Sequence, residues 1–284
     1  MVPGQPSRTA LWVAVARGFA SYDSPPIAED PLAKDLVGGM YGALLGLAGR
    51  VSPLTRLAAR AVDVLTGGRS RFMAYRTRVL DDVVREASRS GIDQLVILGA
   101  GLDARAWRLG EVVSGMDVFE VDHPDTQSIK RDRLAGREAQ SRSITFVGVN
   151  FETDALDAKR LAAGFDARRP AVVLWEGVVM YLPAPAIDAT LTTLRGLLAP
   201  GSRLAISYSR TGVGSGTLLR RAVGVVVRAA GEVFRHHEEP HEMGARVQRC
   251  GFDVVWDEGH PDWAPRYASR SQTWDVQRVV LVGA

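Results

Sequence analysis

The chain has 284 residues, of which 46% are hydrophobic and 24% charged, and its formal net charge is +3, which is ordinary for a globular protein. No apolar run is long enough to predict a membrane span, and the charges are interspersed rather than gathered into a basic stretch, which argues against nucleic-acid binding. The single cysteine, Cys250, excludes an intrachain disulfide and a metal site built of thiolates.

Residues 1–90 are predicted to form a layer of helices. Apolar residues recur at helical spacing in four stretches: 8–21, 29–38, 51–68 and 70–91. We expect the second helix to start at Pro31, where a missing N–H costs nothing, and to end at Gly38 and Gly39. The first residues have no basic start before their apolar part, so we expect no secretory signal and a cytoplasmic protein.

After residue 91 the pattern changes to short, nearly continuous apolar runs separated by helix-like segments. The runs are 94–101, 117–123, 143–151, 171–182 and 202–209, and the clearest helices between them are 126–140 and 183–201. Alternation of this kind predicts an α/β fold with a doubly wound, mostly parallel sheet. Two final strands, within 251–259 and 274–284, have no helix of useful length between them, which predicts an antiparallel hairpin at the sheet edge.

These elements predict a single domain over residues 1–284. The helical layer occupies 1–90, and the sheet core occupies 91–210 and 250–284. Residues 211–249 interrupt the alternation and are expected to form a helical cap over the site. The apolar side chains of this cap favour a hydrophobic small molecule as the substrate.

A glycine turn follows the first strand of the predicted sheet. Gly99 and Gly101 stand in "GAGLDA", which matches the alanine form of the dinucleotide-binding fingerprint. Glycine allows a tight turn and leaves bare main chain beside a ligand. The same pattern is compatible with an ordinary strand-to-helix connection.

Polar side chains follow three further strands. Asp122 ends the second strand, where a carboxylate can accept both hydroxyls of a ribose; the alternative is a helix-capping role, for which Asp125 is also placed. Asn150 and Glu176 follow the third and fourth strands. Glu176 interrupts an apolar run, so we expect it to be half buried and to have a cationic or donor partner.

Two cofactor classes fit such an edge: a nicotinamide dinucleotide and a sulfonium methyl donor. A nicotinamide-binding unit usually begins its chain, whereas here about ninety residues precede the turn. Asp103 inside the turn would also be unfavourable beside a pyrophosphate, which binds to donors and positive dipoles. These features favour the methyl donor, and an NAD(P)-dependent oxidoreductase stays open as the alternative.

The stretches "LVILGAGLDARAWRL", "FEVDHPDTQSIKRDRL" and "VLWEGVVMYLP" resemble the leucine carboxyl methyltransferase family, in particular its bacterial branch of S-adenosylmethionine-dependent O-methyltransferases, which includes polyketide-pathway enzymes. The similarity continues through "AYRTRVLDD" to "HHEEPHEMGARVQRCGF" and covers most of the chain. The resemblance implies a class I methyltransferase fold with a seven-stranded sheet, S-adenosylmethionine as the cofactor, and O-methylation in secondary metabolism.

The resemblance also implies the cofactor contacts. Arg76, with Arg78 close by, would bind the methionine carboxylate, and Glu176 would face its ammonium group. A guanidinium and a carboxylate suit the two ends of a zwitterion. The turn at Gly99 and Gly101 and the ribose carboxylate Asp122 complete the set. The family's adenine-flanking pair is aspartate-leucine, but here it is Asn150 and Phe151, which keeps an acceptor oxygen and loses the charge.

The acceptor is expected to be a small molecule methylated on a carboxylate or a hydroxyl. A carboxylate is already ionised near pH 7 and needs no base, whereas a hydroxyl does. Tyr181 and Tyr208 follow or end the fourth and fifth strands and are candidates for the acceptor side; no general base is predicted, and no oligomeric state. The run 236–242, "HHEEPHE", matches no zinc spacing, so we predict no metal. The departure at Asn150 leaves a non-catalytic binding protein as a further alternative.

Overall fold

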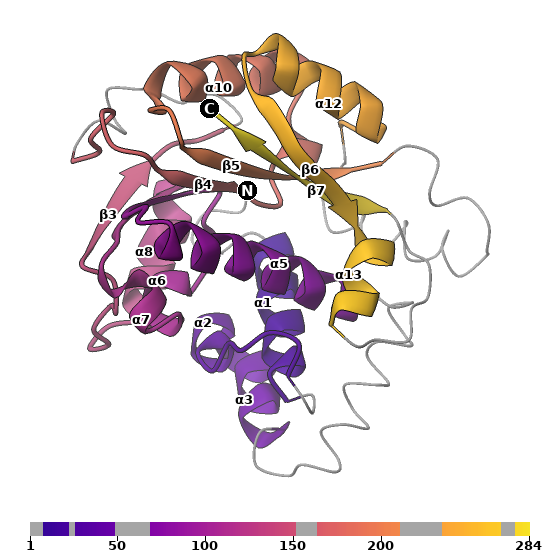
Figure 1. Ribbon diagram of the computed structural model, residues 1–284. Helices are drawn as coiled ribbons and strands as arrows, with labels where there is room; N and C mark the ends of the chain where they lie inside the picture. Colours follow the sequence, from indigo (N-terminus) through magenta and orange to yellow (C-terminus); the bar gives the residue numbers. More distant parts are fainter. Residues whose placement is uncertain (1–7, 23–25, 49–68, 152–163, 211–234, 268–275) are drawn as a thin grey trace, which may run out of the picture.

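The computed structural model describes residues 8–22, 26–48, 69–151, 164–210, 235–267 and 276–284. Within these residues the centre of the molecule is a seven-stranded sheet with the order β3-β2-β1-β4-β5-β7-β6 (Figure 1). Helices cover both faces of this sheet. The predicted α/β class and the mostly parallel seven-stranded sheet are therefore confirmed.

Five strands pair in parallel. They are β1 (Gln94–Leu98), β2 (Asp117–Asp122), β3 (Ser143–Gly148), β4 (Val172–Trp175) and β5 (Arg203–Ser209). Every residue of β1 and β4 is buried. Helices on both faces of a parallel sheet exclude water from both sides of its central strands, which is why these strands are uninterrupted apolar runs in the sequence.

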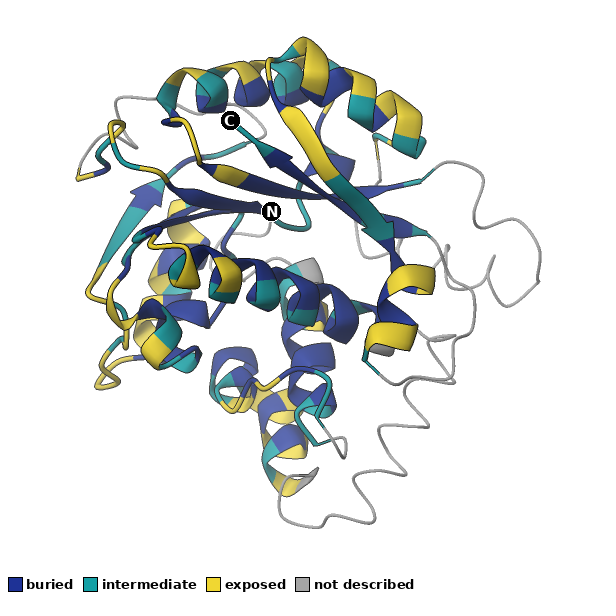
Figure 2. Cartoon of the chain, in the orientation of Figure 1, coloured by how far each residue is buried: buried dark blue, intermediate teal, exposed yellow. Residues whose placement is uncertain are grey.

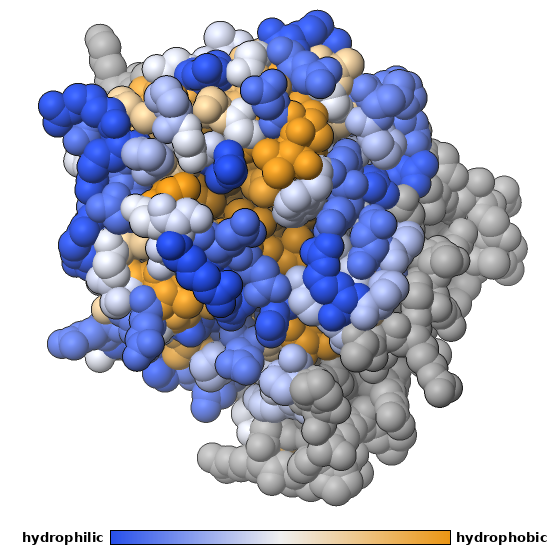
Figure 3. All heavy atoms as spheres, viewed as in Figure 1, coloured by the Kyte–Doolittle hydropathy of each residue, from blue (hydrophilic) through white to orange (hydrophobic). Residues whose placement is uncertain are grey.

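The carboxyl-terminal strands confirm the predicted antiparallel hairpin at the sheet edge and add its strand order. β6 (Asp253–Gly259) and β7 (Gln277–Gly283) pair antiparallel as expected, but β7 lies between β5 and β6, and a short helix, α13 (His260–Arg266), separates the two in sequence. Val279 and Val280 are fully buried, whereas Val255 of β6 is 51% exposed, and apolar side chains reach the surface where β6 crosses the face in Figure 3. The more apolar strand takes the interior position because its burial removes more apolar surface from water.

The helices form layers on the two faces of the sheet (Figure 1). Two lie on one face: α10 (Ala184–Leu197) and α12 (Pro240–Arg249). The opposite face carries α5 (Arg69–Arg89), α6 (Arg105–Arg108), α7 (Glu111–Ser114) and α8 (Pro124–Arg133). Outside α5 lie α1 (Arg8–Ala20), α2 (Ala33–Val37) and α3 (Gly39–Ala48), of which α1 packs directly on α5.

The burial pattern follows these layers. The central strands and the inward sides of the helices are buried, whereas much of β6 and the outward sides of the helices are exposed (Figure 2). One apolar cluster lies between the sheet and the α5 layer, and a second lies between the sheet and α10 and α12. In the described part of the chain, each helix is too short or too polar to cross a bilayer.

Helix boundaries agree with the prediction in part. The predicted first and fourth helices are α1 and α5. Helix α2 starts at Ala33 rather than at Pro31, and it ends before Gly38, whose φ of +61° favours glycine. The helix predicted over 51–68 lies outside the described residues.

The predicted cap over 211–249 also needs correction at its carboxyl end. Residues 211–234 lie outside the described residues, but α12 is part of the layer on the sheet. Pro240 occupies its first turn, and Glu239 and Glu242 form a capping box, which explains why the helix starts here. Met243 and Val247, one turn apart, are fully buried and attach it to the sheet.

Candidate functional site

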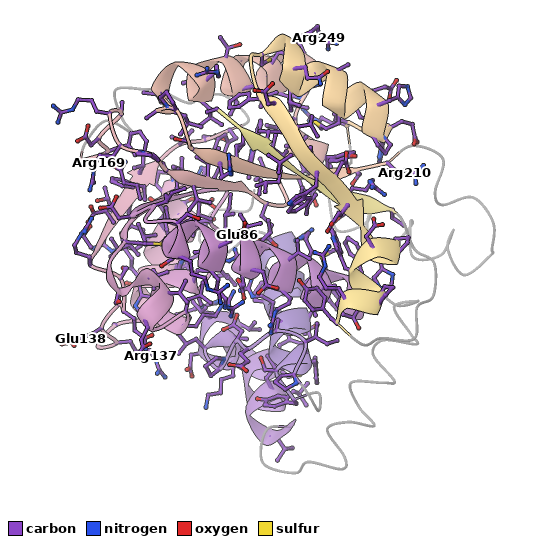
Figure 4. The ribbon with its side chains drawn as sticks, viewed as in Figure 1. Glu86, Arg137, Glu138, Arg169, Arg210 and Arg249 are labelled. Atoms are coloured by element: carbon purple, nitrogen blue, oxygen red, sulfur yellow. The ribbon has the colours of Figure 1, made fainter. Side chains whose placement is uncertain are left out.

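The predicted site residues lie at the edge of the sheet where the parallel strands end. Figure 4 shows Arg169, which precedes β4, and Arg210, which directly follows β5, on opposite sides of the molecule. Arg169 therefore marks the amino-terminal ends of the parallel strands, and Arg210 marks their carboxyl-terminal ends. Ligands of open α/β sheets bind beyond the carboxyl ends of the strands. The site is therefore described from the turn after β1 outward.

Gly99 and Gly101 form this turn, with φ angles of +69° and +48°. A Cβ atom at Gly99 would lie 2.1 Å from Cγ2 of Val178, and one at Gly101 would lie 3.1 Å from Cβ of Ala10. Both positions thus combine a left-handed backbone with neighbours that leave no room for a side chain. The tight turn is present as predicted, and the structure adds that its backbone lies against the segment after β4.

Asp122 ends β2 directly beside the glycine turn. Its carboxylate accepts hydrogen bonds from the backbone N–H groups of Gly101 and His123. Burial raises the pKa of this carboxyl, and the two N–H donors oppose the rise. The alternative capping role falls to another residue, because Nδ1 of His123 caps α8 by accepting from the N–H of Asp125 at 3.2 Å.

Arg76 of α5 and Glu176, directly after β4, form a buried ion pair. Nε of Arg76 lies 3.0 Å from Oε1 of Glu176, and its Nη1 donates to Oε1 of Gln277 at 2.8 Å. Burial opposes ionisation of Glu176, but the charges of Arg105 and Arg76 outweigh it and lower the pKa of the carboxyl. Glu176 therefore has the cationic partner that its position in an apolar run predicts.

Arg78, the other arginine that the sequence left open, takes a different position. Its side chain is 36% exposed and lies 3.3 Å from Asp82 on the same helix. Its guanidinium also lies over the ring of Tyr267. Of the two arginines, Arg76 is the one that reaches the strand ends.

Arg105 is a site residue that the sequence reasoning missed. Its guanidinium, 1% exposed, contacts the carboxylates of Asp81, Asp103 and Glu176. Burial raises the pKa of Asp103, but Arg105 and other nearby cations outweigh it and lower that pKa to about 2. Asp103 thus serves to hold Arg105, and the spacing Asp-Ala-Arg in "LDAR" is the signal that could have indicated this pair.

Helix α1 covers the glycine turn from outside. Arg17 of α1 donates to the carbonyl of Leu102 in the turn, and its Nε donates to Asp30 at 2.8 Å. Arg17 is 5% exposed, and Asp30 is 2% exposed. These contacts join the amino-terminal helices to the candidate site.

Asn150 and Phe151 follow β3 at the same edge as Asp122. The N–H of Val149 donates to the carbonyl of Asp122 at 2.9 Å, which extends the pairing of β2 and β3 up to these residues. Both are half buried, and Phe151 packs against the apolar cluster on the α10 and α12 face. The pair is placed next to the carboxylate predicted to bind a ribose.

The two candidate acceptor residues differ in their surroundings. Tyr181 ends a short 3-10 helix (Val179–Tyr181) after β4 and is half buried. Tyr208 of β5 is 1% exposed, and its hydroxyl donates to Asp257 of β6 at 2.6 Å. Burial and the neighbouring Asp257 raise the pKa of Tyr208. The hydroxyl of Tyr208 is thus used within the sheet, and we assign it no role toward an acceptor.

The histidine- and glutamate-rich run connects two parts of this edge. The N–H of His236 donates to the carbonyl of Met180, and that of Glu238 donates to the carbonyl of Ser209 at the end of β5. Glu238 also accepts from Arg246 of α12. In the described ranges, no group of three or more potential metal ligands comes together.

Comparison with known proteins gives a consistent result. The family Leucine carboxyl methyltransferase matches residues 10–195. A protein of Mycolicibacterium paratuberculosis, named as an inferred S-adenosyl-L-methionine-dependent methyltransferase, is 38% identical over 220 residues, which are 75% of this chain and 70% of that protein. A protein of Mycobacterium marinum with the same name is 40% identical over 207 residues, covering 70% of this chain and 65% of the relative.

Two solved structures share the fold over nearly the whole chain. A DUF574 family protein of Streptomyces avermitilis has a TM-score of 0.61 at 19% identity, covering 94% of this chain and 96% of that one. An inferred methyltransferase of Thermobifida fusca has a TM-score of 0.57 at 18% identity and covers 99% of this chain and 95% of that one. At these identities the likeness concerns the fold.

Proposed function

This chain belongs to the leucine carboxyl methyltransferase family, and we propose that it transfers the methyl group of S-adenosylmethionine to an oxygen of a small-molecule acceptor. The chain is an S-adenosylmethionine-dependent methyltransferase with S-adenosylmethionine as its cofactor. What we add is the placement of the cofactor, the oxygen as the methylated atom, and the class of acceptor.

The observation that carries the proposal is the buried pair of Arg76 and Glu176 beside the glycine turn. A Cβ atom at Gly99 would lie 3.8 Å from the carbonyl oxygen of Glu176, so the turn and the segment after β4 are neighbours. One cation and one anion suit the carboxylate and the ammonium of an amino-acid end. Asp122, on the other side of the turn, suits the ribose hydroxyls. The residues present therefore fit a nucleoside joined to a zwitterion.

The remaining contacts complete the placement. Asn150 offers an amide oxygen to an adenine amino group, and Phe151 offers an apolar surface to the ring. Unlike an aspartate, Asn150 brings no charge, so adenine recognition here depends on a neutral hydrogen bond and on packing. The glycines allow the turn to pack closely against Val178 and Ala10, which fixes the backbone between Asp122 and Glu176.

When bound, S-adenosylmethionine supplies an electrophilic methyl group whose transfer needs an acceptor oxygen in line with the sulfonium. Transfer would break the S–CH₃ bond as the O–CH₃ bond forms, and the electron pair would stay on sulfur. The protein's contribution is to fix both ends of the cofactor and to exclude water. Holding the reacting groups in the correct orientation lowers the activation barrier. Arg76, Glu176 and Asp122 provide the fixed points.

We propose a carboxylate or a hydroxyl of a small, largely apolar molecule, including natural products, as the acceptor. A carboxylate is ionised near pH 7 and needs no base. Of the tyrosines proposed for the acceptor side, Tyr181 stays a candidate, while the hydroxyl of Tyr208 already donates to Asp257. A hydroxyl acceptor would need a base within hydrogen-bond reach.

Binding measurements test the cofactor site. We expect S-adenosylhomocysteine to bind by isothermal titration calorimetry with a Kd in the micromolar range, and NADH and NADPH not to bind. Binding of the nicotinamide cofactors alone would overturn the proposal in favour of an oxidoreductase. A folded protein that binds neither class would favour a binding protein on a methyltransferase scaffold.

Product analysis tests the acceptor. The protein is incubated with methyl-labelled S-adenosylmethionine and matched panels of apolar carboxylic acids and phenols, and products are detected by mass spectrometry. Mild alkali cleaves a methyl ester but not a methyl ether, so the label released on hydrolysis identifies the methylated oxygen. Labelled product carried only on nitrogen, carbon or sulfur would contradict O-methylation.

A further inference from the structure

Arg105 joins three elements around the candidate cofactor site. Its Nε donates to Asp81 of α5 at 2.8 Å, its Nη1 donates to Glu176 at 3.0 Å, and the same Nη1 contacts Asp103 of the glycine turn. Its backbone N–H also donates to Asp103, at 2.7 Å. The side chain is 1% exposed, so each of these contacts is shielded from water.

Arg105 and Arg76 share the Glu176 carboxylate. Arg76 contacts Oε1 and Arg105 contacts Oε2, each at 3.0 Å. A buried carboxylate needs such partners, since a charge left unpaired away from water is costly. If Arg76 engages the carboxylate of a zwitterionic ligand, Arg105 is the partner that stays with Glu176.

The other charges around Glu176 allow Arg76 to bind the ligand while Arg105 stays with Glu176. Besides Arg76 and Arg105, Asp103 acts on Glu176 as a repelling anion and Arg17 of α1 as a more distant cation. Asp81 is also held by Arg108, at 2.7 Å, so Arg105 is not the sole anchor of α5. Among the described residues, Arg105 is the one whose guanidinium contacts both Asp103 in the turn and Glu176.

Resting on the proposed cofactor site, we propose that Arg105 is a positioning residue that makes the site selective for a cofactor with an amino-acid end. It holds the Glu176 carboxylate ionised and aimed at the ligand's ammonium group while Arg76 binds the ligand's carboxylate. Adenosine recognition by Asp122, Asn150 and Phe151 is separate from this function. Arg105 therefore affects one end of the ligand and not the other.

The test compares two ligands that differ in that end. S-adenosylhomocysteine has the zwitterion, and 5′-methylthioadenosine has the same nucleoside and sulfur without it. Titration calorimetry on the full chain is carried out with wild type, Arg105→Lys and the control Arg108→Lys, which alters the same charged cluster at Asp81 without touching Glu176. Lysine keeps the charge, but a single ammonium cannot reach three carboxylates as a planar guanidinium does.

We expect Arg105→Lys to weaken S-adenosylhomocysteine binding about tenfold or more, in the range for loss of a charged contact, and to change 5′-methylthioadenosine binding less than about twofold. Arg108→Lys should leave the ratio of the two affinities unchanged. If Arg105→Lys weakens the binding of both ligands equally, so that the ratio of the two affinities stays unchanged, Arg105 has only a structural function. Wild type that binds neither ligand would instead refute the proposed cofactor site.

A second measurement needs no variant, in case Arg105→Lys does not fold. Arg105 and Arg76 together hold the pKa of Glu176 below its ordinary value of 4.5. The affinity ratio of the two ligands for wild type should therefore be constant from pH 8 down to pH 5. A ratio that collapses with a midpoint above pH 5 would mean that Glu176 is not held ionised, and the proposal would be wrong.

Discussion

Arg76 and Glu176 are 100 positions apart in the chain, yet Nε of one lies 3.0 Å from Oε1 of the other in a buried ion pair. Such a pair stabilises a fold little or not at all relative to apolar residues of similar volume. Its position at the strand ends, next to the glycine turn, agrees with a ligand that carries both charges.

The first prediction concerns Arg76 itself. Arg76→Ala should weaken S-adenosylhomocysteine binding by at least about tenfold, because the ligand's carboxylate loses its cation. It should also lower the free energy of unfolding by about 3 kcal/mol, since one partner of a buried pair is removed while Arg105 still holds Glu176. The control is Arg78→Ala on the exposed side of α5. Calorimetry measures the affinity and urea unfolding measures the stability. If Arg76→Ala and Arg78→Ala change the affinity equally, the site lies elsewhere.

The second prediction concerns Asp122. Asp122→Asn keeps the shape of the side chain and removes the charge that would accept two ribose hydroxyls, so affinity for S-adenosylhomocysteine and for 5′-methylthioadenosine should fall together, each by about tenfold. Asp125→Asn, on a side chain that is 51% exposed three residues later, is the control and should change neither affinity. Unaltered binding of both ligands by Asp122→Asn would remove Asp122 from the site.

The third prediction concerns the glycine turn. Gly99→Ala places a Cβ atom 2.1 Å from Cγ2 of Val178 on a backbone with φ of +69°, so the free energy of unfolding should fall by about 2–4 kcal/mol. The variant with Val178→Ala added should regain part of the loss, because the clash disappears and the backbone strain stays. Gly115→Ala, with nothing within 4 Å of its Cβ position, is the control. If urea unfolding shows that the Gly99→Ala variant is as stable as wild type, this geometry is contradicted.

The fourth prediction concerns pH. Burial raises the pKa of Glu120 to about 7, although Lys130 opposes the rise. Between its ordinary value of 4.5 and about 7, the folded protein holds this proton more tightly than the unfolded chain, so the group makes stability fall as pH increases. In the double variant Glu120→Gln with Lys130→Met, this decrease should vanish. Urea unfolding at pH 5 and pH 8 measures it, and an unchanged pH dependence would show that Glu120 is ionised throughout.

The fifth prediction separates the two tyrosines. Tyr208→Phe removes the donor to Asp257 and should lower the free energy of unfolding by about 1–2 kcal/mol. It should leave kcat and KM of the methyl transfer unchanged, since that hydroxyl is used within the sheet. Tyr181→Phe or Tyr181→Ala should instead raise KM for the acceptor with little effect on cofactor affinity. An altered KM in Tyr208→Phe, with none in Tyr181→Ala, would reverse this assignment.

The sequence by itself determined the fold class and the residues that come together as the candidate site. Uninterrupted apolar runs predict buried parallel strands, and Gly99, Gly101, Asp122 and Glu176 follow such runs directly. Because the carboxyl ends of parallel strands meet at one edge, local position along the chain is enough to predict that these residues lie together.

Only the tertiary structure decided the partners and the exceptions. Three features join segments that are not neighbours in the chain. They are the contacts of Arg105 with Asp81 and Glu176, the position of β7 between β5 and β6, and the packing of α12 on the sheet. Spacing along the chain does not specify which guanidinium reaches which carboxylate, because that choice depends on how separate helices pack on the sheet. The physical reason is that buried charges are stabilised by whichever opposite charge the packed fold brings within reach.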